Sequence, residues 1–232
     1  SIWIRDYAPI WLKDKNGLFV LANFPYGANY FGRQVQDDQF SSFLAQALQI
    51  PLVLDFPRKK IEFYFDGGNL LVDEQGICYT ALKDEDDVLP EVRRSLLQQI
   101  NCKDIVFMKP IPQERTGHVD TFMKILPGQR ALLARYSTSP FKEAMEENKK
   151  LLQGRGFQVI EIEHLDEKDK THWSYLNSVI VGQNAFVPQY GLEQDKSAVR
   201  VFQDLGFIVH PIGAEQIINL RGSLHCITNF IY

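Results

Sequence analysis

Paired apolar runs around a polar turn recur along the chain. The first pair is residues 10–12 and 18–21, and the turn between them contains Asn16 and Gly17. An Asn-Gly turn between apolar runs is the strongest short-range signal for a β-hairpin. Apolar side chains from Phe40 to Leu48 then follow helical spacing over residues 38–48, and residues 51–54 are typical of a short buried strand. The pattern predicts a unit made of a hairpin, a helix and a strand.

The same order of elements returns three more times. The turns of the four predicted hairpins lie near Asn16, Gln75, Gly128 and Gln183, a period of roughly 55 residues, which suits one supersecondary unit per repeat. The later hairpins are expected at residues 70–79, 121–136 and 178–187, the helices at 89–100, 140–153 and 192–205, and the closing strands at 105–108, 157–160 and 207–209.

Such a unit cannot bury its apolar face alone, so neighbouring copies must pack side by side. An α/β ring or propeller therefore fits better than a doubly wound sheet, and an open mixed sheet with helices is the competing architecture. Residues 221–228 occupy the position of a first hairpin strand in a fifth copy, which the chain does not complete. Because the chain also begins without Met inside a polar motif, we expect one N-terminally truncated domain over residues 1–232, with four units and the start of a fifth.

Composition narrows the class of protein. With 232 residues, 45% hydrophobic and 23% charged, the chain is typical of a folded globular protein, not of a disordered or fibrous one. A net charge of -4 and a pI near 5.8 predict no basic surface for nucleic acid, and no apolar run is long enough to cross a membrane. Three cysteines do not suggest a disulfide framework, so Cys78 is expected in the core and packing alone is expected to hold the fold.

A polar cluster lies just ahead of each predicted hairpin. If the copies are related by rotation, these clusters converge around one axis and form a single site. Four of the clusters also have a structural interpretation, because residues 66–69 make a good turn, Asp6 can pair with Arg5, His118 can form a surface pair with Asp120, and Asn177 can cap a turn. The clusters are Trp3, Arg5 and Asp6; Asp66-Gly67-Gly68-Asn69; Gly117-His118-Val119-Asp120; Tyr175, Asn177 and Ser178; and His225 with Cys226.

Three side chains in these clusters are candidates for chemistry. A buried cysteine such as Cys226 is more often an apolar core residue than a nucleophile. The polar residues predicted around Cys226 favour a nucleophile here. His118 and Asp120 are two residues apart, so on a strand both face one side and can act as an acid–base pair. No Cys-x-x-Cys or His-Glu-x-x-His spacing supports zinc, so no metal is expected. No role is assigned to the histidines outside the clusters, which are His164, His172 and His210.

Together the clusters resemble the bacterial-type peptidylarginine deiminase and agmatine deiminase family of the guanidino-group-modifying superfamily. The resemblance runs from end to end of the chain and implies the pentein fold, an α/β propeller of repeated units with pseudo-fivefold symmetry. The chain departs from the family at residues 221–224, where the family often has a fuller run of glycines. The matching stretches are Trp3-Ile4-Arg5-Asp6-Tyr7-Ala8-Pro9, Asp66-Gly67-Gly68-Asn69, Gly117-His118-Val119-Asp120, Asn177 and His225-Cys226-Ile227-Thr228.

The resemblance implies a hydrolase that converts a guanidino group to a ureido group and ammonia, without a cofactor or metal. Cys226 would attack the guanidino carbon to give an amidino-thioether, and His118 would protonate the leaving ammonia and then take a proton from water. A guanidinium ion is planar and always protonated, which suits binding by the carboxylates of Asp6 and Asp120. The resemblance also implies roles in substrate binding for Trp3, Asp66 and Asn177.

Glu114 and Arg33 bear on the choice of substrate. Glu114, four residues before His118, suits the amine of an agmatine-like compound, whereas Arg33 is the candidate partner for the carboxylate or backbone of peptidyl-arginine. The expected partner is thus a small cationic guanidino compound, with an arginine-containing peptide second. No nucleic acid or membrane partner is expected, a homo-oligomer is compatible with the resemblance, and a cytoplasmic location is expected. Two alternatives remain, a Cys-His-Asp acyl-transfer hydrolase and a non-catalytic binding module on the same fold.

Overall fold

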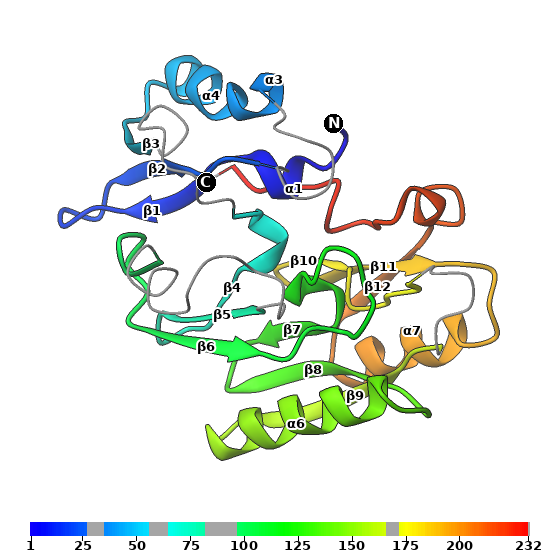
Figure 1. Ribbon diagram of the computed structural model, residues 1–232. Helices are drawn as coiled ribbons and strands as arrows, with labels where there is room; N and C mark the ends of the chain where they lie inside the picture. The colour runs from blue at the N-terminus through cyan, green and yellow to red at the C-terminus, as the bar shows by residue number, and fades with distance from the viewer. Residues whose placement is uncertain (27–34, 56–64, 82–96, 166–171, 232) are drawn as a thin grey trace.

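The computed structural model describes residues 1–26, 35–55, 65–81, 97–165 and 172–231. Most of the helix predicted at residues 89–100 lies outside these ranges, and so does Arg33. The described residues form a mixed α/β structure of small sheets with a few helices (Figure 1). Among them, no helix is both long enough and apolar enough to span a bilayer.

The described strands form four three-stranded sheets with one shared topology. In each sheet the first two strands pair antiparallel as a hairpin, and the third strand pairs parallel with the second. A parallel partner requires a crossover connection, which explains why a long segment separates the second and third strands. The predicted hairpins and closing strands are thus all present. The sheets are β1 Ile10–Lys13, β2 Phe19–Asn23 and β3 Leu52–Asp55; β4 Leu71–Val72, β5 Ile77–Ala81 and β6 Asp104–Met108; β7 Met123–Leu126, β8 Arg130–Arg135 and β9 Gln158–Glu163; β10 Val179–Val181, β11 Asn184–Gln189 and β12 Ile208–Gly213.

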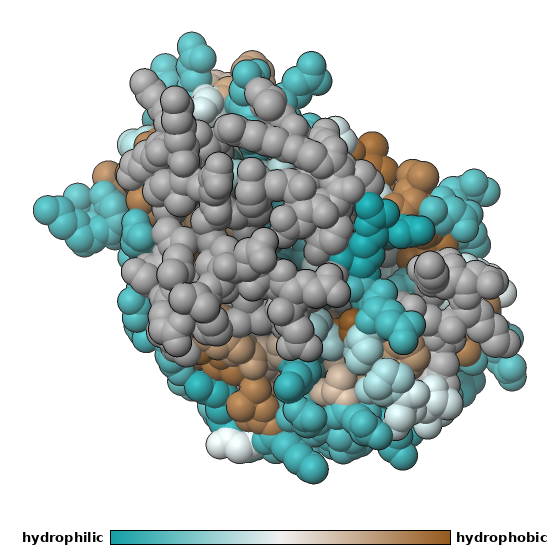
Figure 2. Space-filling view, in the orientation of Figure 1, coloured by the Kyte–Doolittle hydropathy of each residue, from teal (hydrophilic) through white to brown (hydrophobic). Residues whose placement is uncertain are grey.

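Within the described ranges, helices occupy the crossover connections of the first, third and fourth units. The first unit contains α3 Val35–Asp38 and α4 Phe40–Leu48, the third contains α6 Phe141–Gly154, and the fourth contains α7 Asp195–Asp204. Helix α6 packs against β8 and β9, and α7 packs against β11 and β12. In Figure 2 the side chains at the lower edge, where α6 lies in Figure 1, are largely hydrophilic, as expected for the outer face of an amphipathic helix.

The closing strand of the first unit is less buried than its apolar sequence suggests. Val53 in β3 is 49% exposed, so the prediction of a buried strand at residues 51–54 is wrong. The physical reason is that successive side chains of a strand point to opposite faces, and Val53 points to the exposed face while Leu52 and Leu54 point to the other. The apolar spacing of α4 misleads in the same way, because Phe43 is 67% exposed while the small residues Ser41 and Ala45 face inward.

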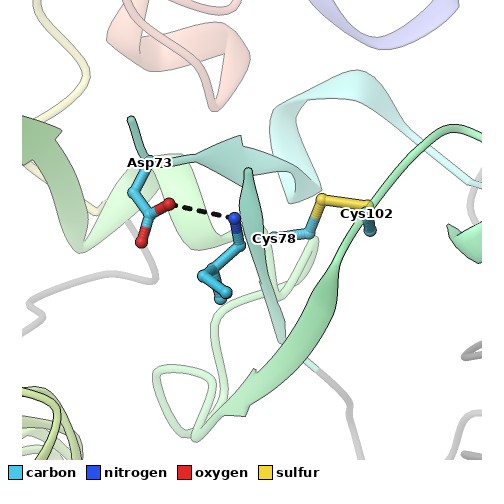
Figure 3. The surroundings of a disulfide bond; sticks show 4 residues. Asp73, Cys78 and Cys102 are labelled. Carbon is cyan, nitrogen blue, oxygen red and sulfur yellow. Dashed lines mark hydrogen bonds between the residues drawn. A yellow bond between two sulfur atoms is a disulfide. The ribbon is translucent and has the colours of Figure 1, made fainter. Parts of the chain in front are cut away.

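A disulfide joins Cys78 to Cys102 within a small apolar cluster between the first two units (Figure 3). The expectation that packing alone holds the fold is therefore wrong. Cys78 lies in β5 and Cys102 lies just ahead of β6, and because β5 and β6 are parallel neighbours, strand pairing brings together two sulfurs that are 24 residues apart in sequence. Disulfides are rare in the cytosol, which weighs against the expected cytoplasmic location. A second, larger apolar cluster joins the second, third and fourth units.

Short helical turns precede the first strands of three sheets. They are α1 Ile4–Tyr7, the 3₁₀ turn η1 Gly67–Asn69 and the 3₁₀ turn η2 Val119–Thr121. His118 and Asp120 therefore lie in a tight turn and not on a strand, since Thr121 N donates to His118 O at 3.2 Å. Cys226 also lies in a turn, where Thr228 N donates to His225 O at 3.1 Å, so the predicted fifth-copy strand is wrong for the described residues.

Candidate functional site

The polar turns ahead of the sheets contact one another. Arg5 N donates to Cys226 O at 3.1 Å, which joins the first turn to the last, and Gly68 N donates to Asp6 Oδ1 at 3.0 Å. A glycine is required at position 68, because a Cβ there would lie 2.7 Å from both Asp6 Oδ1 and His118 Nδ1. The structure thus brings together clusters that are far apart in sequence.

His118 lies between two carboxylates. Its Nε2 is 3.1 Å from Asp66 Oδ2, and its Nδ1 is 3.5 Å from Asp6 Oδ1. Burial alone would lower the pKa of the imidazole, but the charges of Asp6 and Asp66, with a contribution from Asp120, outweigh burial and raise the pKa to about 10. His118 is therefore a cation at neutral pH.

The pKa of Asp6 is also raised, and for this carboxyl a raised pKa favours the neutral form. Burial raises the pKa of its carboxyl to about 7, although the charge of His118 favours the ionised form. The neighbouring carboxylates of Asp66 and Asp120 raise it further. A second cation near Asp6 would lower its pKa, so the site is arranged to favour binding of positive charge.

Asp120 is bound from one side only. Its Oδ2 accepts hydrogen bonds from His225 Nδ1 at 2.6 Å and from Asn177 Nδ2 at 3.3 Å. Its Oδ1 is buried and has no hydrogen-bond partner among the described residues. Burial would raise the pKa of Asp120, but the hydrogen bond from His225 and the positive charges of His118 and Lys124 hold it below its usual value. Asp120 is thus an ionised carboxylate, and one of its two oxygens is buried without a hydrogen bond among the described residues.

His225 and Lys124 complete the environment of Asp120. Burial and the charges of Lys124 and Arg5 lower the pKa of His225 to about 4, although Asp120 favours protonation, so His225 is a neutral hydrogen-bond donor. Lys124 is only 6% exposed, and burial lowers the pKa of its ammonium to about 8. Sequence reasoning gave neither residue a role. The only signal for Lys124 was a charged residue within the apolar run at residues 121–126.

Cys226 is the free cysteine and lies in the buried turn that Asn177 organises. Cys226 N donates to Asn177 Oδ1 at 3.2 Å, and His225 N donates to the same oxygen at 3.0 Å. Burial, and then the charges of Asp120 and Asp6, raise the pKa of the Cys226 thiol well above its usual value. The thiol is therefore neutral at rest, and a bound cation would favour the thiolate by offsetting the charge of the carboxylates.

Two small cavities, with volumes of about 60 and 70 Å³, meet at Cys226. We call the first the acidic lobe and the second the Asn177 lobe. A larger cavity of about 460 Å³ is lined by His225 but not by Cys226. The two smaller cavities are therefore taken as the candidate site, because the free cysteine lines both of them. The acidic lobe is lined by Trp3, Asp6, Tyr26, Asp66 and His118. The Asn177 lobe is lined by Glu114, His172, Ser174, Asn177 and Ile218. Both lobes are lined by Arg115, Thr121, Arg221 and Cys226.

Trp3 and Glu114 are fixed by their neighbours at the edge of the two lobes. The ring of Trp3 lies directly against Gly222, where any Cβ would overlap it. Glu114 accepts hydrogen bonds from the backbone N and hydroxyl of Thr116 at 3.0 and 2.8 Å and from Gly117 N. These bonds fix the loop that leads into His118.

His172 is nearer the site than its sequence position indicated. It lines the Asn177 lobe, and its Nδ1 is 3.2 Å from Tyr136 Oη. Burial lowers the pKa of His172, so it is a neutral side chain there. His164 lies deeper, with Nδ1 3.0 Å from Ile162 O. Within the described ranges, no group of three or more His, Cys, Asp or Glu side chains is placed to hold a metal ion.

Comparisons with known proteins relate the whole chain to one family. A model of the Porphyromonas-type peptidyl-arginine deiminase family matches residues 1–231. A protein of Lactococcus lactis subsp. lactis that is provisionally named agmatine deiminase is 24% identical over 272 residues, which cover 97% of this chain and 73% of that protein.

Solved structures show the same fold. The agmatine deiminase of C. jejuni superposes with a TM-score of 0.77 at 18% identity, covering 97% of this chain and 71% of the other. The agmatine deiminase of Enterococcus faecalis superposes with a TM-score of 0.82 at 20% identity, covering 97% and 73%. At such identities the likeness establishes the fold, and the chemistry must be argued from the site itself.

Proposed function

The chain belongs to the Porphyromonas-type peptidyl-arginine deiminase family, an enzyme family that acts on guanidino groups, and from that premise we propose that it deiminates a guanidino substrate. The products are a ureido compound and ammonia. The agmatine deiminases named above support a guanidine as the reacting group.

Two buried carboxylate oxygens carry the proposal. Asp66 Oδ1 and Asp120 Oδ1 have no hydrogen-bond partner among the described residues. Asp66 lines the acidic lobe together with Cys226, and the charge of Asp120 acts on the Cys226 thiol. An unsatisfied buried carboxylate oxygen is costly, so a ligand that supplies donors is favoured. A guanidinium ion has five N–H donors in one plane and can satisfy such oxygens together. We assign the main charge pairing with the guanidinium to Asp6 and Asp120.

The bound cation would also activate the nucleophile. A guanidinium between Asp6 and Asp120 offsets the two charges that raise the pKa of the Cys226 thiol, so the thiol loses its proton to water. The thiolate attacks the central guanidino carbon, and a C–S bond forms while the C=N electron pair moves onto nitrogen. Fixing the guanidinium plane presents that carbon to the sulfur.

His118 would transfer the protons of both half-reactions. As a cation it donates a proton to one amino nitrogen, the C–N bond breaks, ammonia leaves and an amidino-thioether remains on Cys226. The neutral imidazole then takes a proton from water as the water oxygen attacks the same carbon. The C–S bond breaks, and its electron pair and the remaining hydroxyl proton go to sulfur, which restores the Cys226 thiol. The C=O bond of the ureido product forms as the product is released.

The chain is proposed to act as a single catalytic domain over residues 1–232 of a pentein-type propeller. Four sheets of identical topology and the turn around Cys226 support a pseudo-fivefold ring in which that turn begins the fifth unit. Trp3 is proposed to form a wall beside the substrate stem, and Asn177 to position Cys226. Agmatine and peptidyl-arginine are the substrate classes, with Glu114 proposed to face a substrate amine.

Replacing the nucleophile tests the mechanism directly. Cys226→Ala in the full-length protein should abolish ammonia release from guanidines while calorimetry still detects their binding, because Asp6 and Asp120 remain. As a control, exposed Ser197→Ala on α7 should leave both unchanged. Turnover retained by Cys226→Ala would overturn the covalent mechanism. Hydrolysis of a neutral thioester without any ureido product would instead favour an acyl-transfer enzyme.

A further inference from the structure

The cavity of about 460 Å³ that His225 lines has no role in the proposed reaction. We call it the strand cavity, because the first strand of each of the four described sheets contributes to its wall. Its apolar wall includes Ile10 and Trp11 of β1, Leu71 of β4, Ile125 of β7 and Ile180 of β10. Apolar walls with a few polar groups, in a cavity of this volume, are typical of sites for small organic molecules.

The polar turns separate the strand cavity from the two lobes of the candidate site. Asp6 and Cys226 line the acidic lobe, whereas their chain neighbours Arg5 and His225 line the strand cavity. Among the described residues, no Asp or Glu lines the strand cavity, although two aspartates line the acidic lobe. The two sides of the same turns therefore carry opposite charge, and the strand cavity does not suit a guanidinium ion.

Lys124 is the side chain in the strand cavity that indicates a ligand. It is 6% exposed and lines the cavity, and within the described residues its ammonium group makes no hydrogen bond or ion pair. Burial lowers the pKa of this ammonium to about 8, so most of it is still protonated at neutral pH. A buried ammonium without a hydrogen-bond acceptor is unfavourable, so a ligand that accepts a hydrogen bond from it is favoured.

Arg5 adds a second cation to the same cavity. Its Nε donates to His225 O at 3.4 Å, and its guanidinium lies 5.5 Å from the ring centre of Phe230, which also lines the cavity. The charge of Arg5 lowers the pKa of Lys124 and the charge of Asp120 raises it, so both act on the ammonium. Two cations against one carboxylate leave one positive charge that a ligand with a single negative charge balances.

We propose that the strand cavity binds an organic monocarboxylate, with its carboxylate against Lys124 and Arg5 and its apolar body against the first strands of the sheets. Aliphatic and aromatic monocarboxylates share this chemistry. The proposal goes beyond deimination, because Cys226 does not line the strand cavity and the binding requires no reaction.

Calorimetry on the full-length protein tests the class of ligand. The probes are hexanoate, benzoate, neutral hexanamide and chloride. At least one of the two carboxylates should bind at one site per chain and roughly tenfold or more tightly than hexanamide, which lacks the charge, and chloride, which lacks the apolar body. The tighter of hexanoate and benzoate identifies the shape of the apolar body.

Three results with these probes would overturn the proposal. Equal affinity for hexanamide would exclude the charge pairing, and equal affinity for chloride would exclude the apolar contacts. If neither carboxylate bound the full-length protein, there would be no such site, as expected where another segment of the protein fills the cavity.

Matched variants locate the site. Lys124→Met should weaken carboxylate binding by roughly 10- to 100-fold, as expected for a lost hydrogen bond to a charged group, and Lys124→Arg should recover part of the loss. Ile180→Trp should also weaken binding, because it fills the cavity from β10 and leaves both cations in place. Exposed Lys196→Met on α7 is the control and should not change the affinity. Unchanged affinity in either Lys124→Met or Ile180→Trp would place the ligand elsewhere and refute the proposal.

The pH dependence of binding tests the pairing in the wild-type protein itself. The charged groups that act on Lys124 are Arg5 of α1, Asp120 of η2 and Cys226 of the last turn, and neutral His225 lines the same cavity. Asp120 is ionised below pH 7, and the pKa of Cys226 is well above its usual value, so Lys124 is the group among these that titrates near pH 8.

Carboxylate affinity should therefore fall as the pH rises through about 8, because Lys124 loses its proton while the ligand stays ionised. Binding above that pH should take up a proton, which calorimetry in two buffers with different ionisation enthalpies measures. The fall should be absent in Lys124→Met. A wild-type affinity that stayed constant from about pH 7 to about pH 9.5 would refute pairing of the ligand with Lys124.

Discussion

The turns that carry His118 and His225 place two buried imidazoles near Cys226 with opposite properties. Each imidazole contacts a carboxylate, at 3.1 Å for His118 and 2.6 Å for His225. Burial lowers the pKa of both, yet the pKa of His118 is raised to about 10 and that of His225 is lowered to about 4. The difference must therefore come from the remaining neighbours.

Those neighbours carry charges of opposite sign. Carboxylates lie near both ring nitrogens of His118, whereas His225 contacts one carboxylate and is close to the cations Lys124 and Arg5. Contact with an aspartate therefore does not by itself make a histidine an acid–base residue. The summed charge around the ring keeps His118 protonated at neutral pH and leaves His225 neutral, with its Nδ1 donating to Asp120.

Replacing His118 should give the largest effect, because His118 is the histidine that we propose to transfer protons. His118→Gln keeps a polar group near Asp66 but supplies no transferable proton, so kcat should fall by about 10²- to 10⁴-fold, the usual contribution of general acid–base catalysis. Wild-type kcat should itself fall above about pH 10, where His118 loses its proton. Steady-state ammonia release across neutral and alkaline pH measures both. A loss below about tenfold would contradict the assignment.

Asp120→Asn tests the carboxylate that His225 orients. The amide keeps the size of the side chain but loses the charge that pairs with a guanidinium, a loss of about 2 to 3 kcal/mol or roughly 30- to 150-fold in binding. Calorimetry in the Cys226→Ala background separates binding from chemistry. Asp195→Asn, which removes a buried carboxylate charge on α7 away from both lobes, is the matched control for general loss of structure. If the Cys226→Ala protein bound the guanidine with equal affinity before and after the Asp120→Asn change, charge pairing by Asp120 would be excluded.

His225→Gln should have a smaller effect than His118→Gln. Glutamine can still donate a hydrogen bond to Asp120 with altered geometry, so we expect a loss of roughly tenfold or less, close to one ordinary hydrogen bond. The alkaline limb near pH 10 should not move, because His118 is intact. Parallel pH profiles of the two variants decide the matter. If His225→Gln abolished that limb, His225 and not His118 would be the acid.

The fold was predictable where local pattern determines it. The turn at Asn16 and Gly17 and the repeated apolar runs indicated the hairpins and closing strands, since both are short-range signals. The Cys78–Cys102 disulfide was missed because it depends on the parallel pairing of β5 and β6, and a spacing of 24 residues carries no information about that pairing. The exposure of Val53 was missed because a run of apolar residues does not show which face of its strand is covered.

The meeting of the polar clusters could be predicted from the sequence, but the electrostatics and several neighbours of the candidate site could not. A shared position ahead of each hairpin indicated that Asp6, His118 and Cys226 would meet. The charge state of each group depends on neighbours from other turns, so Lys124 and the neutral state of His225 could not be inferred from spacing. Arg115 and Arg221 were missed for the same reason, because only the folded loops place them at both lobes.

Lys124→Met should give the smallest effect. It tests whether the charge of Lys124 keeps the pKa of His225 low. Without the cation, the pKa of His225 should rise from about 4, so His225 becomes protonated at higher pH and offsets the charge of Asp120. In wild type, kcat/KM should fall at acid pH as Asp6, whose pKa is about 7, becomes protonated. In the variant, protonation of His225 at lower pH should lower kcat/KM further.

The expected loss from Lys124→Met in mildly acidic solution is roughly fivefold or less, or on the order of 1 kcal/mol, because Lys124 acts on the substrate only through the protonation of His225. Above about pH 8, where Lys124 of wild type is itself neutral, the two profiles should converge. Log kcat/KM measured against pH tests this, since the acid limb of the variant should be steeper than that of wild type. A uniform loss at every pH would mean that Lys124 acts by packing and that its charge does not set the state of His225.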